Sequence, residues 1–525
     1  MKKSKLYLNR NFMIDRVDRR LFSSFIENGE MVDKLMYDPG HPTANANGMR
    51  QDTIDLIKEL KIPMLRVSGN HNSAYNWKEG IGPREEREPR FDPAWERIDS
   101  NQVGLDEYDQ WAKEIGAEVM PGVNLGTGTP NDARDMIEYT NHKGGSRYSN
   151  LRIKHGHQEP YNYKMWCLGN ELDGDWQMGY QPIDHYPLKA EQAARRMKAI
   201  DPSIKAVVVG SSNSGMHTFI DWEYKTLMQA PELFDYVALH TYYGNHDDEI
   251  KDFLSQTIDL DQFIRGVAGV CEAVESKVRL DKKFYISVDE WNVSRHATYN
   301  FPYHTYNEKR LSIFPPYDMM DVLMVAMQLM TMINHSDRVK VACLSLITSL
   351  VWARTSYDVL KTTCYYPFQL MNRMSDGYAL RQTLETEYYA SKYYASVPMI
   401  ETASILNDQG EIVVFAVSRN TDEAMELDIE ASGFGEGLRV VSHTEIHDDD
   451  PHAINSVENP YRVVPKEVAV PEKGTSVTLK PLSFNVLVLR PESVSKDGAD
   501  FAKLQEAGRP TEYISPEFSY IPRPI

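Results

Sequence analysis

Residues 163–174 read YKMWCLGNELDG, a short apolar run that ends in an amide and a carboxylate. The stretch Tyr163–Glu171 reads as a buried β-strand by its apolar content. Nearly continuous apolar runs of this kind are typical of parallel strands that are covered on both faces. The stretch therefore predicts a parallel strand that brings Asn170 and Glu171 to one end of a sheet.

The same pattern occurs eight times before residue 350, and amphipathic stretches fill most of the gaps. In 49–60, for example, Ile54, Ile57 and Leu60 recur at the spacing of one helical face. Similar helical patterns occupy 105–115, 187–200, 249–278 and 318–334. The eight expected strands are Arg20–Glu27, Pro63–Gly69, Ala117–Asn124, Tyr163–Glu171, Lys205–Ser212, Asp235–Thr241, Lys283–Glu290 and Lys340–Ile347.

Eight alternations of strand and helix predict an α/β fold of the (β/α)8 TIM barrel type. A doubly wound open sheet is the main alternative. The barrel is favoured because the strand count is eight and because no glycine-rich phosphate loop follows the first strand.

The ends of these runs carry unusual polar residues, whereas their beginnings do not. Three of them end in Gly169-Asn170-Glu171, His240-Thr241-Tyr242 and Asp289-Glu290-Trp291-Asn292. Catalytic residues of a (β/α)8 barrel lie where the strands finish. The asymmetry predicts a functional site at one mouth of the barrel.

The pattern of the sequence changes after about residue 385. Apolar runs at 412–417 and 483–489 read as strands, and Thr421-Asp422-Glu423 is a turn-like separator. We expect a (β/α)8 barrel at 16–384 and a jelly-roll-like β-sandwich built from 1–15 and 385–492. Residues 493–525 form a proline-containing extension that we expect to lie extended over a surface.

The composition describes an ordinary folded chain of 525 residues, 42% hydrophobic and 25% charged, with a net charge of −19. A strongly acidic surface repels phosphate backbones and anionic lipids, so nucleic acid and membrane surfaces are poor partners. The charge fits a neutral or small substrate.

No targeting or membrane segment stands out. The start, MKKSKLYLNR, carries positive charge but no apolar stretch after it. The most apolar segment, 322–333, is too short to span a bilayer and predicts a buried helix. Cys167, Cys271, Cys343 and Cys364 lie far apart, as reduced core thiols do. These features predict a cytoplasmic protein.

Two carboxylates, Glu171 and Glu290, close very apolar strands, the fourth and the seventh. Burying an ionised carboxylate beside such walls is costly unless partners are supplied. Each could simply pair with a basic residue or cap the next helix. Two of them on opposite sides of one barrel mouth favour function, because they can converge on a single ligand.

A carboxylate pair is the machinery of glycoside hydrolysis. One member delivers a proton to the leaving oxygen, and a separation of about 5 Å gives a covalent glycosyl-enzyme, whereas about 6.5–9.5 Å leaves room for water. Asn170, next to Glu171, could bond a sugar hydroxyl or satisfy local backbone groups. His240 could bond a catalytic glutamate or fill the barrel mouth, and Trp291 is expected to shape the surroundings of Glu290. Both are expected to contact the substrate, as are Ser294 and Ser345.

At this point the chain resembles glycoside hydrolase family 51, whose members are typically α-L-arabinofuranosidases. The matching stretches run from about residue 20 to about residue 490, and the longer ones discriminate best. They are Phe25-Ile26-Glu27, Tyr37-Asp38-Pro39-Gly40-His41-Pro42-Thr43, Tyr75-Asn76-Trp77-Lys78-Glu79-Gly80-Ile81-Gly82-Pro83-Arg84, Glu159-Pro160-Tyr161-Asn162, Trp166-Cys167-Leu168-Gly169-Asn170-Glu171-Leu172-Asp173-Gly174, Asp289-Glu290-Trp291-Asn292 and Pro481-Leu482-Ser483-Phe484-Asn485-Val486.

The resemblance implies that Glu171 is the acid/base and Glu290 the nucleophile of a retaining enzyme. It implies sugar-binding roles for Glu27, Asn70, Asn170 and Tyr242. It also implies removal of terminal arabinofuranose from arabinan and arabinoxylan oligosaccharides, independence of metals and other cofactors, an intracellular location and a homo-oligomer, often a hexamer.

Three positions in the sugar pocket depart from the family pattern. The stretch before Asn70 is one residue shorter than usual, Ser294 stands where a tryptophan is common, and Ser345 stands where a sugar-contacting glutamine is common. The two glutamates are unaffected. The chemistry is therefore expected to hold, while the sugar could be a larger or differently shaped furanose, or a pyranose such as xylose.

Three alternatives remain open on the sequence. One is another retaining glycosidase on the same barrel, such as a β-xylosidase or an endoglucanase. The second is a carbohydrate-binding barrel without activity, and the third is a metal-dependent barrel enzyme. For the favoured mechanism the pKa of Glu171 is expected to be raised by apolar walls and by the negative charge of Glu290.

Overall fold

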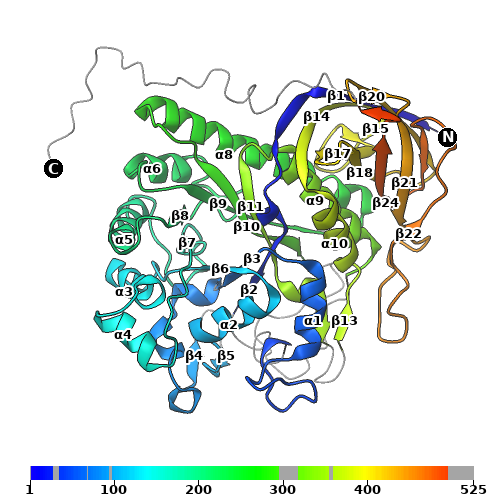
Figure 1. Cartoon of the computed structure of the whole chain (residues 1–525). Coiled ribbons are helices and arrows are strands. Elements are labelled where there is room, and N and C mark those ends of the chain that lie inside the picture. The colour runs from blue at the N-terminus through cyan, green and yellow to red at the C-terminus, as the bar shows by residue number, and fades with distance from the viewer. Residues whose placement is uncertain are drawn as a thin grey trace.

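The computed structural model describes residues 2–27, 35–67, 69–93, 97–294, 317–353 and 359–494. A barrel of parallel strands wrapped by helices forms one body, and a β-sheet domain packs against its side (Figure 1). The predicted fold class is confirmed.

All eight predicted barrel strands are present. They form one parallel sheet in the order β6-β3-β2-β11-β10-β9-β8-β7, and a bridge between Gly122 and Cys167 joins its two edges. The strands are β2 Ser23–Ile26, β3 Met64–Val67, β6 Glu118–Pro121, β7 Met165–Leu168, β8 Lys205–Val208, β9 Tyr236–Gly244, β10 Tyr285–Ser294 and β11 Val339–Ser345.

Helices cover the outside of the barrel. Those of the described residues are α1 Gln51–Leu60, α2 Leu105–Ile115, α3 Pro130–Asn141, α4 Arg147–Lys154, α5 Tyr186–Ile200, α6 Asp221–Gln229, α7 Ile250–Leu254, α8 Thr257–Val278, α9 Met319–Asn334 and α10 Tyr365–Met374. The five predicted helical stretches are all helical. At the start of α3, Thr129 and Asp132 form a capping box and Pro130 occupies the first turn, a combination that sets the first helical residue.

The stretch 249–278, expected as one helix, is divided into α7 and α8. Arg419 of the β-domain donates from Nε to the carbonyl of Leu254 at 3.0 Å. The amide of Ile258, which would bond that carbonyl in a continuous helix, bonds Ser255 instead. A contact from another domain therefore interrupts a pattern that is helical by its own periodicity.

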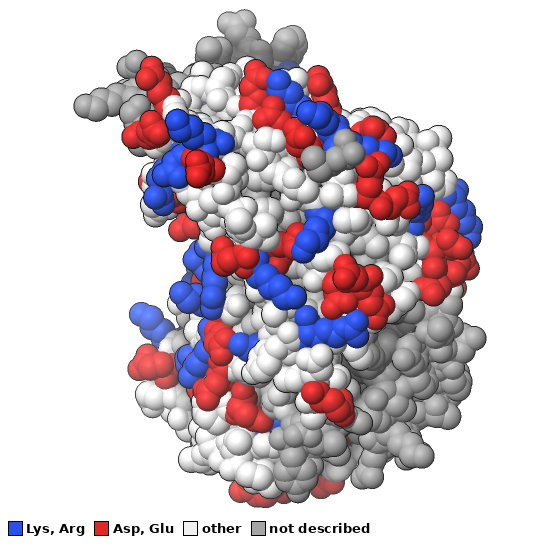
Figure 2. Space-filling model, turned by 90° about the vertical axis from the view of Figure 1, so that its right-hand side faces the viewer, with Lys and Arg blue, Asp and Glu red and all other residues white. Residues whose placement is uncertain are grey.

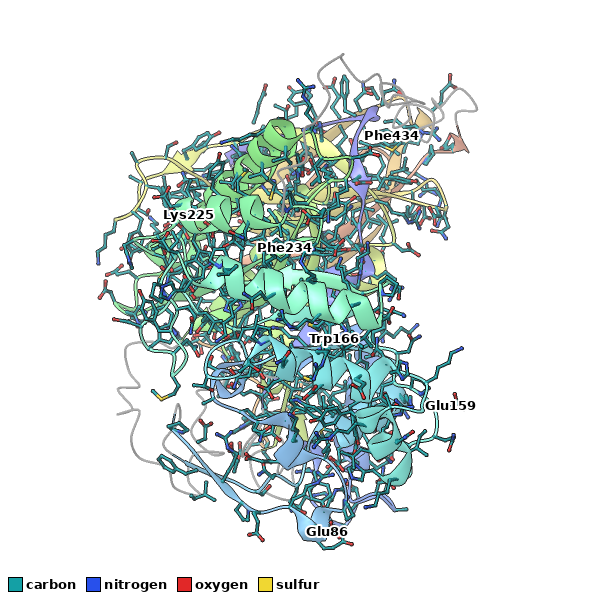
Figure 3. All side chains as sticks on the ribbon, turned by 90° about the vertical axis from the view of Figure 1, so that its left-hand side faces the viewer. Glu86, Glu159, Trp166, Lys225, Phe234 and Phe434 are labelled. Carbon is teal, nitrogen blue, oxygen red and sulfur yellow. The ribbon has the colours of Figure 1, made fainter. Side chains whose placement is uncertain are left out.

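Alternate residues of each barrel strand point to opposite sides. On β7, Met165 and Cys167 belong to the cluster inside the barrel, whereas Trp166 and Leu168 belong to the core under the helices (Figure 3 labels Trp166). The inner side chains fill the barrel below its mouth, and the outer ones bind the helices to it. Both faces of the strands are buried, which explains their continuous apolar sequence.

The second body is a nine-stranded sheet that packs around a core of its own. Its order is β22-β21-β24-β18-β17-β14-β1-β19-β23. The strands are β1 Lys2–Arg16, β14 Gly377–Glu385, β17 Ile400–Asn407, β18 Ile412–Ser418, β19 Met425–Ser432, β21 Arg439–Ile446, β22 Lys466–Glu467, β23 Val477–Leu479 and β24 Ser483–Arg490. Short two-stranded pairs are β4 Arg90–Asp92 with β5 Arg97–Asp99, β12 Val351–Ala353 with β13 Val359–Lys361, β15 Tyr388–Tyr389 with β16 Val397–Pro398, and β20 Gly435–Glu436 with β25 Ser493–Val494.

This sheet begins at Gly377, earlier than the expected boundary at 385, because β14 pairs with β1 along residues 378–385. The sequence of β14, GYALRQTLE, has three polar residues in a row after Leu380, and its second half is exposed or only partly buried, so it lacks the continuous apolar run of the barrel strands. The N-terminal strand β1 joins the sheet as predicted, and it lies between β14 and β19 (Figure 1). The expected extension lies outside the described residues from 495 onward.

Helix α9 lies between the two bodies. Every residue from Met319 to Ile333 is buried, and the helix contacts β10 and β11 of the barrel and β14, β17, β18 and β24 of the sheet domain. A helix that is apolar on all sides has to be enclosed by protein. The prediction of a buried helix here is confirmed, and no helix in the described ranges is long and apolar enough to cross a membrane.

The expectation of reduced core thiols agrees with the structure. All four cysteines are free thiols and buried. On the face shown in Figure 2, acidic and basic side chains are interspersed, and neither sign forms a field of its own. This surface offers no continuous basic track for a phosphate backbone.

Candidate active site

The chain turns sharply where β7 ends, and the turn aims Glu171. Strand β7 finishes at Leu168, so Glu171 lies in the turn after the strand and not at its last position as expected. Gly169 has φ of 110° and Glu171 has φ of 48°, both in the left-handed region. A Cβ on Gly169 would meet Leu172 at 2.6 Å, so only glycine fits there. Left-handed backbone at a residue other than glycine is strained and is often found at functional sites.

Three side chains hold the carboxylate of Glu171. Trp176 Nε1 and Gln177 Nε2 each donate to Oε2 at 2.9 Å. His240 Nδ1 lies 2.9 Å from Oε1. Ser73 donates to Gln177 at 2.6 Å and so fixes the amide that reaches Glu171. The carboxylate is buried and has a defined orientation at the barrel mouth.

Glu290 reaches the same mouth from a bulge in β10. Ser287 pairs with Ala238 of β9, but Glu290 pairs with His240, so β10 contains one extra residue between these positions. The extra residue lets both Asp289 and Glu290 contact groups inside the barrel, although neighbours on a regular strand point to opposite sides. The bulge thereby places two consecutive carboxylates at one site.

Different groups contact the two oxygens of Glu290. Arg66 Nη1 donates to Oε2 at 2.9 Å. The hydroxyl of Tyr242 donates to Oε1 at 2.6 Å and lies 2.7 Å from Ser345 Oγ. A guanidinium and a phenol that donate to the two oxygens of one carboxylate fix its orientation.

Glu171 and Glu290 are close enough to act on one atom. A carboxylate oxygen of each and a ring nitrogen of His240 all lie within 4.8 Å of one another. Carboxyl groups about 5–5.5 Å apart are typical of glycosidases that form a covalent intermediate, and pairs about 6.5–9.5 Å apart admit a water molecule instead. The observed spacing supports direct attack by one carboxylate while the other transfers a proton.

His240 carries the proton of this cluster. Burial favours the neutral ring, but the charge of Glu290 and hydrogen bonds with Asp289 and Glu171 outweigh it and raise the pKa of His240 to about 10. Its Nε2 lies 3.1 Å from Asp289. The ring is therefore an imidazolium between carboxylates over the range in which a free histidine loses its charge.

The expectation that Glu171 has a raised pKa is wrong for the unliganded site. Burial does push the pKa of Glu171 upward, but hydrogen bonds from His240, Trp176 and Gln177 lower it below its ordinary value. The apolar walls and the charge of Glu290 can be expected from the strand sequences, but the three hydrogen-bond donors to Glu171 cannot. The proton needed for acid catalysis lies on His240, 2.9 Å from Glu171 Oε1.

Arg66 is a site residue that the sequence reasoning missed. It is 1% exposed, and besides Glu290 it contacts Asn170 Oδ1 at 2.5 Å and Asp289 at 3.7 Å. Its position in β3 has the same parity as Met64, which points into the barrel. A cation at an inward position of an otherwise apolar strand could have identified it, because a buried cation needs anionic partners.

Trp176 and Gln177 were also missed, because both lie in a loop without periodicity. Trp176 is 47% exposed although its Nε1 bonds the buried Glu171. Its ring leaves no room for a Cβ on Gly174, the nearest contact being 2.4 Å. The Asp-Gly pair ahead of it in the sequence indicates a tight turn, and such a turn returns the chain to the strand end.

The structure describes the side chains of some of the other predicted site residues but not of all. Asn170 and Ser345 are buried at the mouth, and Glu27 lies beside Gly69, whose added Cβ would come 3.0 Å from Glu27 Oε1. The side chains of Asn70 and Ser294 lie outside the described residues.

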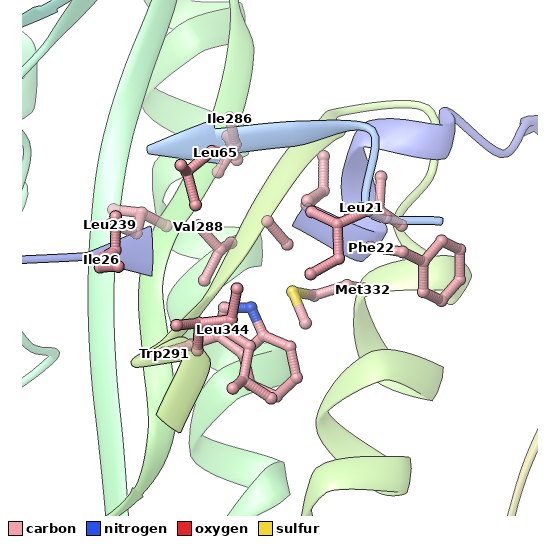
Figure 4. Close-up of a cluster of buried hydrophobic side chains, with 14 of the residues drawn as sticks. Leu21, Phe22, Ile26, Leu65, Leu239, Ile286, Val288, Trp291, Met332 and Leu344 are labelled. Carbon is pink, nitrogen blue, oxygen red and sulfur yellow. The ribbon is translucent and has the colours of Figure 1, made fainter. Parts of the chain in front are cut away.

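Trp291 does not line the mouth, and the expectation that it binds the ligand is wrong. Its side chain is fully buried in the core between strands and helices, near Val288, Leu344 and Met332 (Figure 4). The reason is the strand alternation, which resumes after the bulge and turns residue 291 outward. Trp291 stabilises the strand that carries Glu290 and does not face the pocket.

Comparisons with known proteins agree with this geometry. Residues 56–265 match the family model described as alpha-L-arabinofuranosidase 1 domain, and residues 289–483 match the alpha-L-arabinofuranosidase C-terminal domain. An intracellular exo-alpha-(1->5)-L-arabinofuranosidase of Bacillus subtilis (strain 168) is 39% identical over 94% of this chain and 100% of its own length. An exo-alpha-(1->6)-L-arabinofuranosidase of Bifidobacterium longum is 34% identical over 93% of this chain and 97% of its own.

Solved structures show the same likeness. A family 51 alpha-L-arabinofuranosidase from Bifidobacterium longum superposes with a TM-score of 0.87 at 30% identity, over 93% of this chain and 99% of that one. An arabinose complex of an alpha-L-arabinofuranosidase from Thermotoga maritima gives a TM-score of 0.82 at 28% identity, with 93% and 99% covered.

Proposed function

The chain belongs to the family 51 α-L-arabinofuranosidases, and from this premise we propose that it is a retaining, exo-acting enzyme that removes terminal α-L-arabinofuranosyl residues from arabinan and arabinoxylan oligosaccharides. The observation that carries the proposal is the pair Glu171 and Glu290, whose carboxylates approach within 4.8 Å at the barrel mouth. That spacing fits double displacement at one anomeric carbon.

Glu290 is the nucleophile in this proposal. Arg66 and Tyr242 donate to its two oxygens and hold it oriented. It attacks the anomeric carbon as the bond from that carbon to the leaving oxygen breaks, and a covalent glycosyl-enzyme forms. Asp289 does not attack, because its carboxylate is buried between Arg66 and His240.

Glu171 is the acid/base, and it shares its proton with His240. Transfer of the proton from Nδ1 to Oε1 leaves a neutral imidazole and a carboxylic acid that can protonate the leaving oxygen. Binding of the sugar removes water from the pair, which disfavours separated charges and promotes this transfer. In the second step Glu171 accepts a proton from water, and the hydroxide attacks the glycosyl-enzyme to release arabinose.

Sugar recognition is assigned to the residues around the pair. Asn170 has its amide oxygen on Arg66, and its amide group is assigned to the 2-hydroxyl of the sugar. Glu27, Asn70, Tyr242 and Ser345 complete the proposed set, with Ser294 at the strand end. An arabinose-containing oligosaccharide is the partner, the location is cytoplasmic as in the relatives named intracellular, and the chain assembles as a homo-oligomer.

A metal-dependent reaction is the second candidate, since Glu171, His240 and Glu290 present three donor atoms within 4.8 Å. Zinc sites commonly combine histidine with carboxylates. Activity that is lost to a chelator and restored by divalent ions would support the metal; unchanged activity supports acid/base catalysis.

Two variants test the assignment. Glu290→Ala is expected to lower kcat by about 10⁵-fold on every arabinofuranoside, as loss of a nucleophile does. Glu171→Ala is expected to lose only about 10-fold on a substrate with a good leaving group but about 10³-fold on an oligosaccharide, and added azide should restore turnover by replacing the base. The assignment is wrong if either variant retains the parent activity on arabino-oligosaccharides.

A further inference from the structure

Asp173 is a buried carboxylate that the proposed mechanism does not use. It follows Glu171 by two positions in the turn after β7 and is 1% exposed. Both of its oxygens accept hydrogen bonds from Ser212, one from the backbone amide at 2.9 Å and one from the hydroxyl. Burial of a carboxylate costs free energy unless hydrogen bonds compensate it. The two bonds from Ser212 therefore tie the end of this turn to the segment that follows β8.

A second tie holds the beginning of the same turn. The hydroxyl of Tyr186 donates to the carbonyl of Leu168 at 3.0 Å and accepts from the amide of Val209 at 2.7 Å. Leu168 is the last residue of β7, and Val209 directly follows β8. Glu171 lies between the two ties, so its left-handed backbone is held from both sides by one neighbouring strand end.

The segment that follows β8 also supports His240. The amide of His240 donates to the carbonyl of Ser211, the neighbour of Ser212, at 3.4 Å. The amide of Ser211 in turn donates at 2.7 Å to Glu223, a buried residue of α6, so the segment is itself anchored. The contact of 2.9 Å between His240 Nδ1 and Glu171 Oε1 therefore joins two elements that rest on one common support.

We propose that Asp173 is a positioning residue for the acid/base, and that through Ser212 it fixes the turn so that the carboxyl of Glu171 stays within reach of the leaving oxygen. This inference rests on the proposed function. An acid transfers its proton only within hydrogen-bond reach of the acceptor, and a displacement of about 1 Å costs about 10²-fold in rate. Attack by Glu290 does not depend on this turn, because donors on β3 and β9 hold that residue.

The test compares two substrates on each purified full-length variant. An arabino-oligosaccharide needs a proton on its leaving oxygen, whereas 2,4-dinitrophenyl α-L-arabinofuranoside releases a phenolate without one. Asp173→Asn should lower kcat/KM about 10²-fold on the oligosaccharide and less than about threefold on the aryl glycoside. On the aryl glycoside its kcat and KM should fall together, because Glu171 is also the base of the second step, and added azide should restore kcat.

Two further variants separate positioning from a general loss of structure. Ser212→Ala keeps the carboxylate and its bond to the backbone amide, so it should lower the ratio of oligosaccharide to aryl activity only about fivefold. Asp175→Asn makes the same change at an exposed position of the same loop and should keep this ratio within about twofold of the parent value. Each ratio is measured on one preparation, so any loss of folded protein cancels.

Equal losses on the two substrates in Asp173→Asn, or a ratio equal to that of the parent, overturn the positioning role. An unchanged ratio in Ser212→Ala overturns it even where Asp173→Asn yields no folded protein. A change of ratio in Asp175→Asn as large as that in Asp173→Asn overturns it as well. Failure of the parent to turn over either substrate overturns the proposed function instead.

Discussion

The two carboxylates at the barrel mouth are supported in different ways. Glu171 lies in a strained turn beyond its strand, and its charged neighbour is an imidazolium that can give up a proton. Glu290 lies within its strand and accepts a hydrogen bond from a guanidinium that does not titrate in the working range, with the His240 ring farther away at 3.6 Å. The difference teaches which role each can perform: the first lies closest to a group that can exchange a proton, and the second is held by a donor that cannot.

Removing the guanidinium of Arg66 should have the largest effect on stability and on kcat/KM. Arg66→Met leaves Asp289 and Glu290 buried with only His240 as a cation, and loss of one partner of a buried charge group costs about 3–5 kcal/mol of stability. We expect kcat/KM to fall by about 10³-fold even where the variant is folded. Urea unfolding and kinetics on the same preparation measure both quantities.

Arg66→Lys is the matched control, since it keeps the charge but not the fork that reaches both Asn170 and Glu290. It should recover most of the stability and little of the activity. Full activity in Arg66→Met would show that Glu290 does not depend on its ion pair.

Replacing the titrating partner should change the pH dependence. The active form holds one proton on Glu171 and His240, and the raised pKa of His240 retains that proton at alkaline pH. His240→Gln removes this reservoir, so the basic limb of the kcat/KM profile should move to lower pH, with about 10²-fold less activity at the optimum. If the basic limb of His240→Gln lies at the same pH as that of the parent, His240 does not hold the proton that catalysis needs.

The same shift affects stability. The folded pKa of His240 is above its ordinary value of 6.5, so its contribution is fully present below pH 6.5 and is lost as the pH rises toward about 10. Thermal unfolding of the parent and His240→Gln between pH 6 and pH 10 should show the difference between them shrinking with pH.

The smallest effect on kcat/KM is expected from removal of an uncharged hydrogen-bond donor to Glu171. Trp176→Phe keeps the ring and removes the hydrogen bond to Glu171 Oε2, which helps to lower the pKa of that carboxyl. The pKa of Glu171 should rise, so the basic limb of the profile should move to higher pH, with a loss of about 3–10-fold in kcat/KM. Met178→Leu, at a similarly exposed position of the same loop, is the control and should leave the limb in place.

The sequence predicted the parts of the site that follow from strand periodicity. The runs that end near Glu171 and Glu290 are continuous and apolar because both faces of each strand are covered, and the eight-fold repeat identified the barrel. His240 and Tyr242 were found for the same reason, since they follow an apolar run directly.

Other features depend on geometry that periodicity does not encode. The bulge in β10 changes which residues face the pocket, so Glu290 was placed correctly but Trp291 was not. Arg66 does not stand out by apolar content. It stands out only when each residue of the strand is assigned to the inner or the outer side of the barrel. The lowered pKa of Glu171 follows from donors that lie in a loop and on another strand.

The most direct measurement identifies the residue that becomes glycosylated. A 2-deoxy-2-fluoro-α-L-arabinofuranoside with an activated leaving group should accumulate a covalent intermediate, because the fluorine slows both steps and the leaving group restores the rate of the first step only. Peptide mass spectrometry should find the sugar on the peptide that contains Glu290, and the first product of an ordinary substrate should keep the α configuration by NMR. A label on any other residue, or an inverted first product, would contradict the account.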